Sequence, residues 1–152
     1  MDLNDQNDSL VTRSATLEDE LWLWEQYSQL LGPLIDKQWG WDEAFQRSKF
    51  LEHLPYTLFT ILEKQNSKVA AFAERTDQNR IYLHMLLVVF EHQSHGVRTH
   101  VINLLKAQSR CSNLPIELSV FSANPLTKYY EKHGFERIEE TAEKQVFRWS
   151  PE

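Results

Sequence analysis

The stretch HQSHGVRTHV, His92 to Val101, follows a long apolar run and leads into a helical pattern. A strand, a glycine loop and a helix in this order often bind phosphate. Backbone amides at a helix N-terminus point outward, and the helix dipole favours an anion there. The loop from Gln93 to Thr99 offers such amides, and Gly96 allows close approach of the backbone. The competing interpretation is that Gly96 only makes a turn before the helix.

Helical and alternating apolar patterns predict the elements that position this loop. A first helix starts at Thr16, which forms a capping box with Asp19, and stops at Gly32 and Pro33. Three further helices are expected over residues 39–55, 97–112 and 124–135. In the last of these, Asn124 is the N-cap and Gly134 the C′ residue. Strands are expected over residues 10–13, 56–63, 68–76, 81–90, 116–120, 135–141 and 144–149.

This order predicts an α/β (α+β) fold with one mixed central sheet and helices on both faces. The strand at 81–89 is expected to lie beside the strand at 116–120 and parallel to it, because a helix connects them. The apolar run 81–90 predicts a central strand that is covered on both sides. Residues 1–8 are expected to form a flexible tail, and residues 9–152 a single domain.

The composition argues against several classes of protein. The formal net charge is -6, which disfavours broad nucleic-acid binding. The lone Cys111 forms no internal disulfide and no cysteine zinc site, and no metal is expected. The acidic N-terminus is unlike a signal peptide, and no stretch approaches the ~20 apolar residues of a membrane span. A cytoplasmic protein without a membrane segment is therefore expected.

Two motifs resemble those of the GNAT superfamily of acyl-CoA-dependent N-acyltransferases. Its members carry Gln/Arg-x-x-Gly-x-Gly/Ala after the central strand, and here Gln93 and Gly96 match while Arg98 replaces the last small residue. NPLTKYYEKHGF resembles the family's NP….YEK.GF ending. A third stretch, QWGWDEAFQ, is similar to a tryptophan-rich segment in one branch of the superfamily. The resemblance covers nearly the whole chain.

The resemblance implies an N-acetyltransferase that uses acetyl-CoA and a primary amine in a ternary complex. It implies that Tyr130 gives a proton to the departing thiolate, although its neighbour Tyr129 is an alternative. A backbone amide near Val88 or Val89 is implied as the donor that polarises the thioester carbonyl. The implied cofactor-binding set is Val88, Val89, Gln93, Ser94, His95, Gly96, Val97, Arg98, Thr99 and Asn124. For Asn124, helix capping is the stronger interpretation.

The acceptor side rests on fewer residues. His84 lies where some members of the superfamily carry a carboxylate base, but a lone histidine in an apolar run is more often a core residue. Substrate-binding candidates are Trp39, Trp41, Asp42 and Glu43, for which packing or helix-start roles are alternatives. A small-molecule or peptide amine is expected as acceptor, with no nucleic-acid or membrane partner. A homodimer is compatible with the sequence.

Arg98 separates two functional hypotheses. If its side chain turns outward along the pyrophosphate, it adds a charge-assisted contact, and this is the expected arrangement. If it projects into the phosphate cradle, it blocks close approach. The second outcome favours a GNAT-fold binding or regulatory module with a degenerate cofactor site. A nucleic-acid-binding module is a third hypothesis, which the acidic composition disfavours.

Overall fold

A computed structural model of the chain describes residues 9–93, 96–122 and 124–151. Its centre is a seven-stranded mixed sheet in the order β1-β2-β3-β4-β5-β7-β6. The strands are β1 (Val11–Ser14), β2 (Phe59–Lys64), β3 (Ser67–Thr76), β4 (Ile81–Val88), β5 (Ile116–Phe121), β6 (Glu136–Glu140) and β7 (Lys144–Trp149). β4 and β5 pair in parallel, and the other described pairs are antiparallel. The predicted parallel pair is therefore confirmed.

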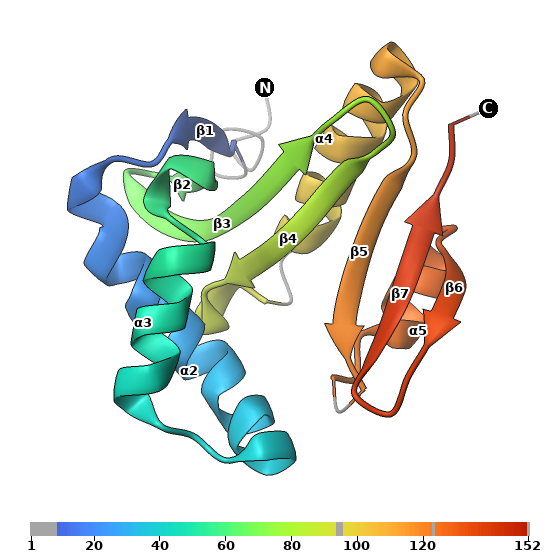
Figure 1. Ribbon diagram of the computed structural model, residues 1–152. Helices are drawn as coiled ribbons and strands as arrows, with labels where there is room; N and C mark the ends of the chain where they lie inside the picture. The colour runs from blue at the N-terminus through green and yellow to red at the C-terminus, as the bar shows by residue number, and fades with distance from the viewer. Residues whose placement is uncertain (1–8, 94–95, 123, 152) are drawn as a thin grey trace.

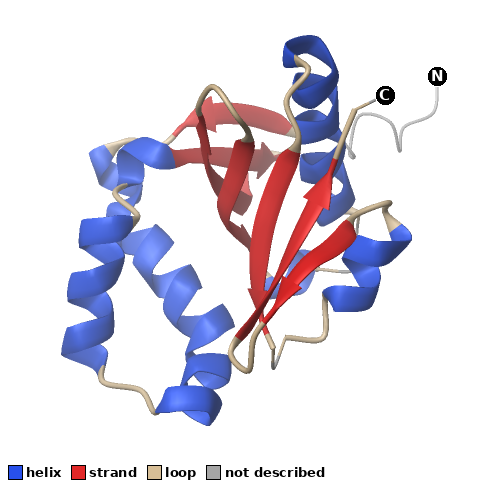
Figure 2. Ribbon diagram, turned by 45° about the vertical axis from the view of Figure 1, so that its right-hand side comes forward, coloured by secondary structure: helices blue, strands red, loops and turns tan. Residues whose placement is uncertain are grey.

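Helices cover both faces of the sheet, as predicted (Figures 1 and 2). α2 (Glu20–Trp39) and α3 (Glu43–His53) lie on one face, and α4 (Val97–Ser112) and α5 (Thr127–Lys132) on the other. Three short 3-10 turns complete the order: η1 (Leu17–Asp19), η2 (Tyr56–Leu58) and η3 (Phe90–His92). None of the helices in the described part of the chain is long and apolar enough to cross a membrane.

Two apolar clusters, one on each face of the sheet, hold the layers together. Between the sheet and α4–α5 lie fully buried side chains such as Ile81, Ile102 and Phe147. Between the sheet and α2–α3, Trp24 and Phe50 pack on small residues of β3, including Ala71. Burying one large aliphatic or aromatic side chain contributes about 1.5–3 kcal/mol, so these clusters fix where the helices lie.

The sequence analysis predicted that the first long helix stops at Gly32 and Pro33. In the structure the helix continues to Trp39. Buried residues on both sides of the proline, Leu23 and Ile35 among them, outweigh the lost backbone hydrogen bond. The helix ends instead at Gly40, which has a φ of 86°. Trp39 therefore belongs to α2 and not to the second helix, which begins only at Glu43.

The fourth strand contains a β-bulge that decides where the site forms. Ala73 of β3 pairs with Met85, but the next residue of β3 pairs with Leu83, so His84 is the extra residue. β4 and β5 then pair over three residues only, from Ile81 to Leu83, and diverge beyond them (Figure 1). The sequence analysis predicted that β4 is covered on both sides. This prediction is wrong for part of the strand, because His84 is exposed.

Asp19 ties three elements near the N-terminal end of α2. Its side chain is 3% exposed and forms ion pairs with Arg13 of β1 (2.8 Å) and Lys68 of β3 (2.7 Å). It also accepts a hydrogen bond from the Thr16 amide at 2.8 Å, which confirms the predicted capping box. The hydrogen bond from Arg13 is the main cause that holds the pKa of this carboxyl well below its usual range; burial opposes it.

We expect Asp19→Asn to lower the free energy of unfolding by roughly 2–3 kcal/mol at pH 7, because it leaves Arg13 and Lys68 without a buried anion. A lowered pKa in the folded state contributes stability above the ordinary Asp pKa and loses it as the pH falls. The difference from the wild type should therefore narrow below about pH 4. Urea denaturation at pH 7 and below about pH 4 measures the free energy of unfolding of both proteins. Glu18→Gln, which removes an exposed carboxylate, is the control and should have little effect.

Candidate active site

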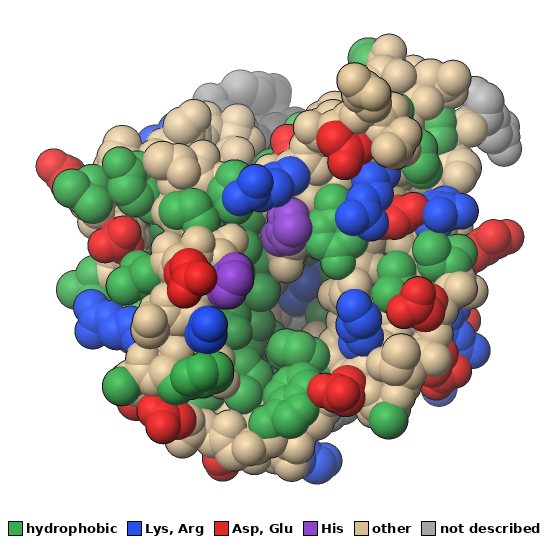
Figure 3. All heavy atoms as spheres, viewed as in Figure 1, with side chains coloured by type: hydrophobic (Ala, Val, Ile, Leu, Met, Phe, Trp, Pro, Cys, Tyr) green, Lys and Arg blue, Asp and Glu red, His purple; other side chains and the backbone are tan. Residues whose placement is uncertain are grey.

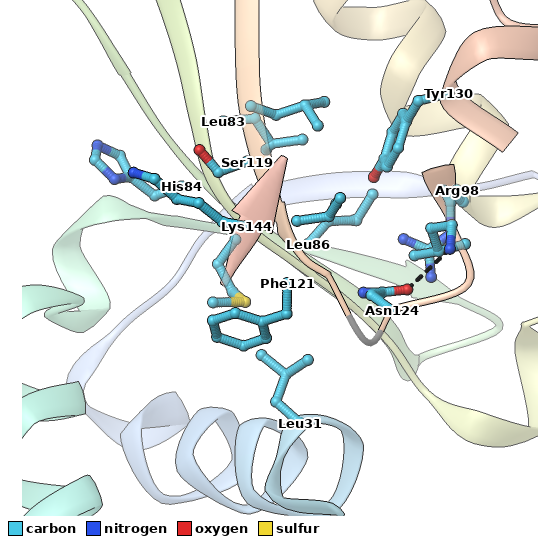
Figure 4. A pocket seen from close by; sticks show the side chains of 14 residues that line it. Leu31, Leu83, His84, Leu86, Arg98, Ser119, Phe121, Asn124, Tyr130 and Lys144 are labelled. Atoms are coloured by element: carbon cyan, nitrogen blue, oxygen red, sulfur yellow. Dashed lines mark hydrogen bonds between the residues drawn. The ribbon is translucent and has the colours of Figure 1, made fainter. Parts of the chain in front are cut away.

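A cavity of about 200 Å³ lies where β4 and β5 diverge (Figure 4). Its walls come from both strands, from α2, from the start of α4, from the α5 region and from β7. The lining residues are Leu31, Leu83, His84, Met85, Leu86, Arg98, Leu118, Ser119, Val120, Phe121, Asn124, Leu126, Tyr130 and Lys144. Figure 3 shows a hollow on this face of the molecule, with basic and histidine side chains around it.

The divergence leaves backbone amides of β4 unpaired along the cavity. The Val89 amide donates to the Val69 carbonyl at 2.9 Å, so this is a hydrogen-bonded pair. In an antiparallel ladder such pairs alternate with unbonded ones. The amides of Leu86 and Val88 therefore point away from β3, toward the gap beside β5. The sequence analysis suggested the amides of Val88 and Val89. The Val89 amide already donates to Val69, whereas the Val88 amide points toward the gap. The Leu86 amide, which the sequence analysis did not name, points the same way.

The predicted phosphate loop leads into the start of α4. Gly96 is the N-cap of the helix and has a φ of 76°, which glycine adopts at little cost. A Cβ at this position would meet nothing within 4 Å, so conformation, not space, requires glycine. The amides of Val97, Arg98 and Thr99 belong to the first turn, which has no intrahelical acceptors. Gln93 donates its side-chain amide to the Val88 carbonyl at 3.2 Å.

Two of the predicted loop residues, Ser94 and His95, lie outside the described part of the chain. Two others have structural roles for their side chains. Val97 is buried in the core, so only its backbone faces the loop. The Thr99 hydroxyl is hydrogen-bonded to the Tyr129 hydroxyl at 2.7 Å and is not free for a ligand.

The sequence analysis expected the Arg98 side chain to turn outward. In the structure it lines the cavity instead (Figure 4). Its guanidinium carbon lies 6.0 Å from the centre of the Tyr129 ring, within the range of a cation–π contact. No carboxylate in the described residues forms an ion pair with it. The Tyr129 ring and a hydrogen bond to the buried Tyr130 hydroxyl hold the guanidinium inward, and no carboxylate among the described residues pairs with it beside the first turn of α4.

The two adjacent tyrosines have different surroundings. Tyr130 is 3% exposed and lines the cavity, with its hydroxyl near Arg98 in Figure 4. Burial raises the pKa of the Tyr130 hydroxyl, while the charge of Arg98 and a hydrogen bond from it oppose the rise. Tyr129 is half-buried, and Thr99 engages its hydroxyl. Of the two alternatives, Tyr130 is the one that faces the cavity, and it stays protonated at neutral pH.

His84 lines the opposite part of the cavity, where the bulge turns it out of the apolar core. Its ring meets Tyr82 edge-on with centroids 4.6 Å apart. Burial lowers the pKa of His84, and the positive charges of Arg75 and Arg80 lower it further. The imidazole is therefore neutral at pH 7 and able to accept a proton.

Asn124 reaches the cavity but is not the N-cap of α5, which begins at Thr127 after Leu126. Its Oδ1 accepts a hydrogen bond from the Leu126 amide at 3.0 Å and shapes the turn before the helix. Gly134 follows the helix with a φ of 90°, as predicted.

The predicted acceptor residues serve mainly the structure. Trp41 stacks on Trp24 with centroids 5.9 Å apart, and its indole donates to Glu43 at 2.9 Å. Asp42 caps α3 by accepting the Phe45 amide at 3.0 Å. None of Trp41, Asp42 and Glu43 lines the cavity.

Trp39 comes closer to the cavity than these three residues. Its ring meets the cavity residue Phe121 edge-on at 5.3 Å, and its indole donates to Glu143 at 3.0 Å. The sequence analysis did not name the wall on this side: Leu31 comes from α2, Ser119 and Phe121 from β5, and Lys144 from β7, whose pairing with β5 the sequence does not specify. Among the described residues, no group of three His, Cys, Asp or Glu side chains could hold a metal ion.

The unpaired strand edge, the adjoining helix N-terminus and the buried tyrosine are features of an acyltransferase that binds a phosphate-bearing cofactor. The family model of the acetyltransferase (GNAT) domain matches residues 39–151, and the chain therefore belongs to the GNAT acetyltransferase family. Acetyl-CoA is the acyl donor of this family, as the sequence analysis expected. A search of curated proteins found no significant match.

Solved structures confirm the predicted GNAT fold. PaiA N-acetyltransferase of Thermoplasma acidophilum, in complex with coenzyme A, matches with a TM-score of 0.72 at 15% identity, over 93% of this chain and 99% of that one. Naa50 of Arabidopsis thaliana, in complex with the bisubstrate analogue CoA-Ac-MVNAL, matches with a TM-score of 0.68 at 17% identity, over the same shares of the two chains, 93% and 99%. At these identities the likeness concerns the fold.

Proposed function

We propose that the protein transfers an acetyl group from acetyl-CoA to a primary amine by direct attack. The observation that carries this proposal is the open edge of β4, which runs from the amides of Leu86 and Val88 to the first turn of α4. An extended cofactor that ends in a pyrophosphate would find backbone amide donors along β4 and at the start of α4. Family membership gives the same class of reaction.

The described residues fit the cofactor at both ends of that path. The free amides of Val97, Arg98 and Thr99 and the dipole of the 16-residue helix α4 suit an anionic group. Arg98 points inward, but its guanidinium lies against Tyr129 and Tyr130, where it adds a positive charge that no carboxylate in the described residues neutralises. The cofactor supplies an acetyl thioester, and the protein supplies hydrogen-bond donors and proton carriers around it.

Three groups have roles in the transfer. The amides of Leu86 and Val88 are preorganised donors for an oxygen atom that gains negative charge, and such donors stabilise a transition state strongly. Tyr130 is protonated and donates its proton to the departing thiolate. His84 is neutral and takes a proton from the acceptor amine, directly or through water.

The acceptor enters from the side of His84, where Leu31 and Phe121 form an apolar wall. A small amine or a peptide N-terminus fits this opening. Naa50 was solved with an analogue that joins coenzyme A to a peptide, which supports a peptide as one such acceptor.

Tyr130→Phe is expected to lower kcat by about 100-fold or more and to leave the Kd for coenzyme A nearly unchanged, because a proton donor acts as the thiolate leaves. Tyr129→Phe removes the hydroxyl next in sequence and should have a small effect on kcat. Steady-state acetylation and calorimetric titration measure both quantities. Equal rates for Tyr130→Phe and the wild type, where chemistry limits turnover, would assign Tyr130 to packing.

Arg98 variants test the cofactor site itself. If the arginine assists binding, Arg98→Gly should bind acetyl-CoA more weakly and Arg98→Glu much more weakly, because a negative charge replaces a positive one beside the phosphates. Added salt should also weaken binding by the wild type. Calorimetry that finds tighter binding by Arg98→Gly would contradict this and favour the alternative, a GNAT-fold binding module without catalysis.

A further inference from the structure

The cavity has an uneven charge. Its lining includes Arg98, Lys144 and His84 but no aspartate or glutamate, although the whole chain has a net charge of -6. Arg98 belongs to the end beside α4, where the cofactor phosphates are expected. Lys144 belongs to the other end: Figure 4 shows its side chain extending in the direction of His84 and Ser119. The cofactor therefore accounts for Arg98 but not for Lys144.

Lys144 has no anionic partner among the described residues. It pairs with Phe121 across β5 and β7, which places its side chain on the face of the sheet that His84 occupies. The acidic neighbour Glu143 is turned toward α2. Its carboxylate accepts a hydrogen bond from the Trp39 indole at 3.0 Å, and its backbone carbonyl accepts one from the Gln38 side chain at 3.1 Å. An unpaired ammonium group thus borders the acceptor end of the cavity.

The rest of this face adds positive charge near His84. Glu117 lies between Arg80 (2.7 Å) and Arg148 (2.8 Å), so one carboxylate faces two guanidinium groups. Burial raises the pKa of Glu117, but the two arginines outweigh it, and the net pKa is lowered. Arg75 and Arg80 are both close enough to His84 to lower its pKa, although burial is the larger cause.

The carboxylates of the edge strand β6 lie further from the cavity. Glu136 and Glu139 belong to β6, which is separated from β5 by β7, and they pair with Arg148 and Val146. Glu74 of β3 pairs with Leu83, but it accepts a hydrogen bond from Thr76, which accepts one from Gln108 of α4, so it belongs to the other face of the sheet. The charged side chains that line the cavity, Arg98 and Lys144, are both positive. A polyamine would bring a second ammonium group into this field and be repelled.

We propose that the acceptor amine also carries a carboxylate, and that Lys144 binds this carboxylate while the amine lies at His84. Leu31, Met85 and Phe121 provide apolar surface for the carbon atoms between the two groups. A free amino acid offers this chemistry through its α-carboxylate, and a peptide offers it through a first residue of Asp or Glu. The inference rests on the proposed acetyl transfer and specifies its substrate class.

Matched acceptor pairs test this inference and separate the two sources. Alanine is compared with alaninamide, and peptide amides that begin with Glu or Asp are compared with those that begin with Gln or Asn; spermidine is the polycationic acceptor. The carboxylate member of at least one kind of pair should have a kcat/KM at least about tenfold higher, because an ion-paired contact replaces a neutral one. Calorimetry on protein saturated with coenzyme A should give the same order of affinities without turnover.

Lys144→Glu should abolish or invert the preference, and Lys144→Met should reduce it. Lys49→Glu makes the same charge change at an exposed site on α3 outside the cavity and should keep it. Equal values within every pair, spermidine as the best acceptor, no binding or turnover of any acceptor, or an unchanged preference in Lys144→Glu would each overturn the inference. Failure of the wild type to bind coenzyme A would overturn the proposed function as well, which distinguishes the two failures.

Discussion

The separation of β4 from β5 is the feature on which the site depends. One extra residue, His84, shifts the alternation of β4, so that the strand stops pairing with β5 after Leu83. The amides of Leu86 and Val88 are then left without a partner from the sheet. Unpaired backbone donors at the centre of a sheet are costly unless a ligand or water satisfies them. In the proposed function, an extended cofactor adds hydrogen-bond partners at this place and offsets the cost.

The side chains around this gap are arranged in two halves. Toward α4, Arg98 and Tyr130 combine a permanent positive charge with a buried hydroxyl that stays protonated. Toward β7, the lowered pKa of His84 keeps its imidazole neutral, and Lys144 has no anionic partner among the described residues. The cavity therefore has a protonated phenol at one end and a neutral imidazole at the other. This division agrees with a transfer in which one thiolate gains a proton and one amine loses a proton.

The sequence predicted the order of the elements because periodicity and capping are local properties. Thr16, Gly96 and Gly134 have backbone roles that short stretches encode. The length of α2 was predicted wrongly because packing on both sides of Pro33 outweighs a local stop signal. The bulge at His84 and the cavity position of Lys144 depend on pairing between strands distant in sequence. Neither has a local signature, and for this reason the sequence analysis named His84 without its bulge and did not name Lys144.

Amide hydrogen exchange along β4 tests the central claim most directly. In the free protein, the amides of Met85 and Leu87 bond to β3 and should exchange slowly, while those of Leu86 and Val88 should exchange faster. Saturating coenzyme A should slow Leu86, Val88 and the first turn of α4, and leave Met85 and Leu87 unchanged. Unchanged exchange at Leu86 and Val88 with coenzyme A bound would contradict the placement of the cofactor between β4 and β5.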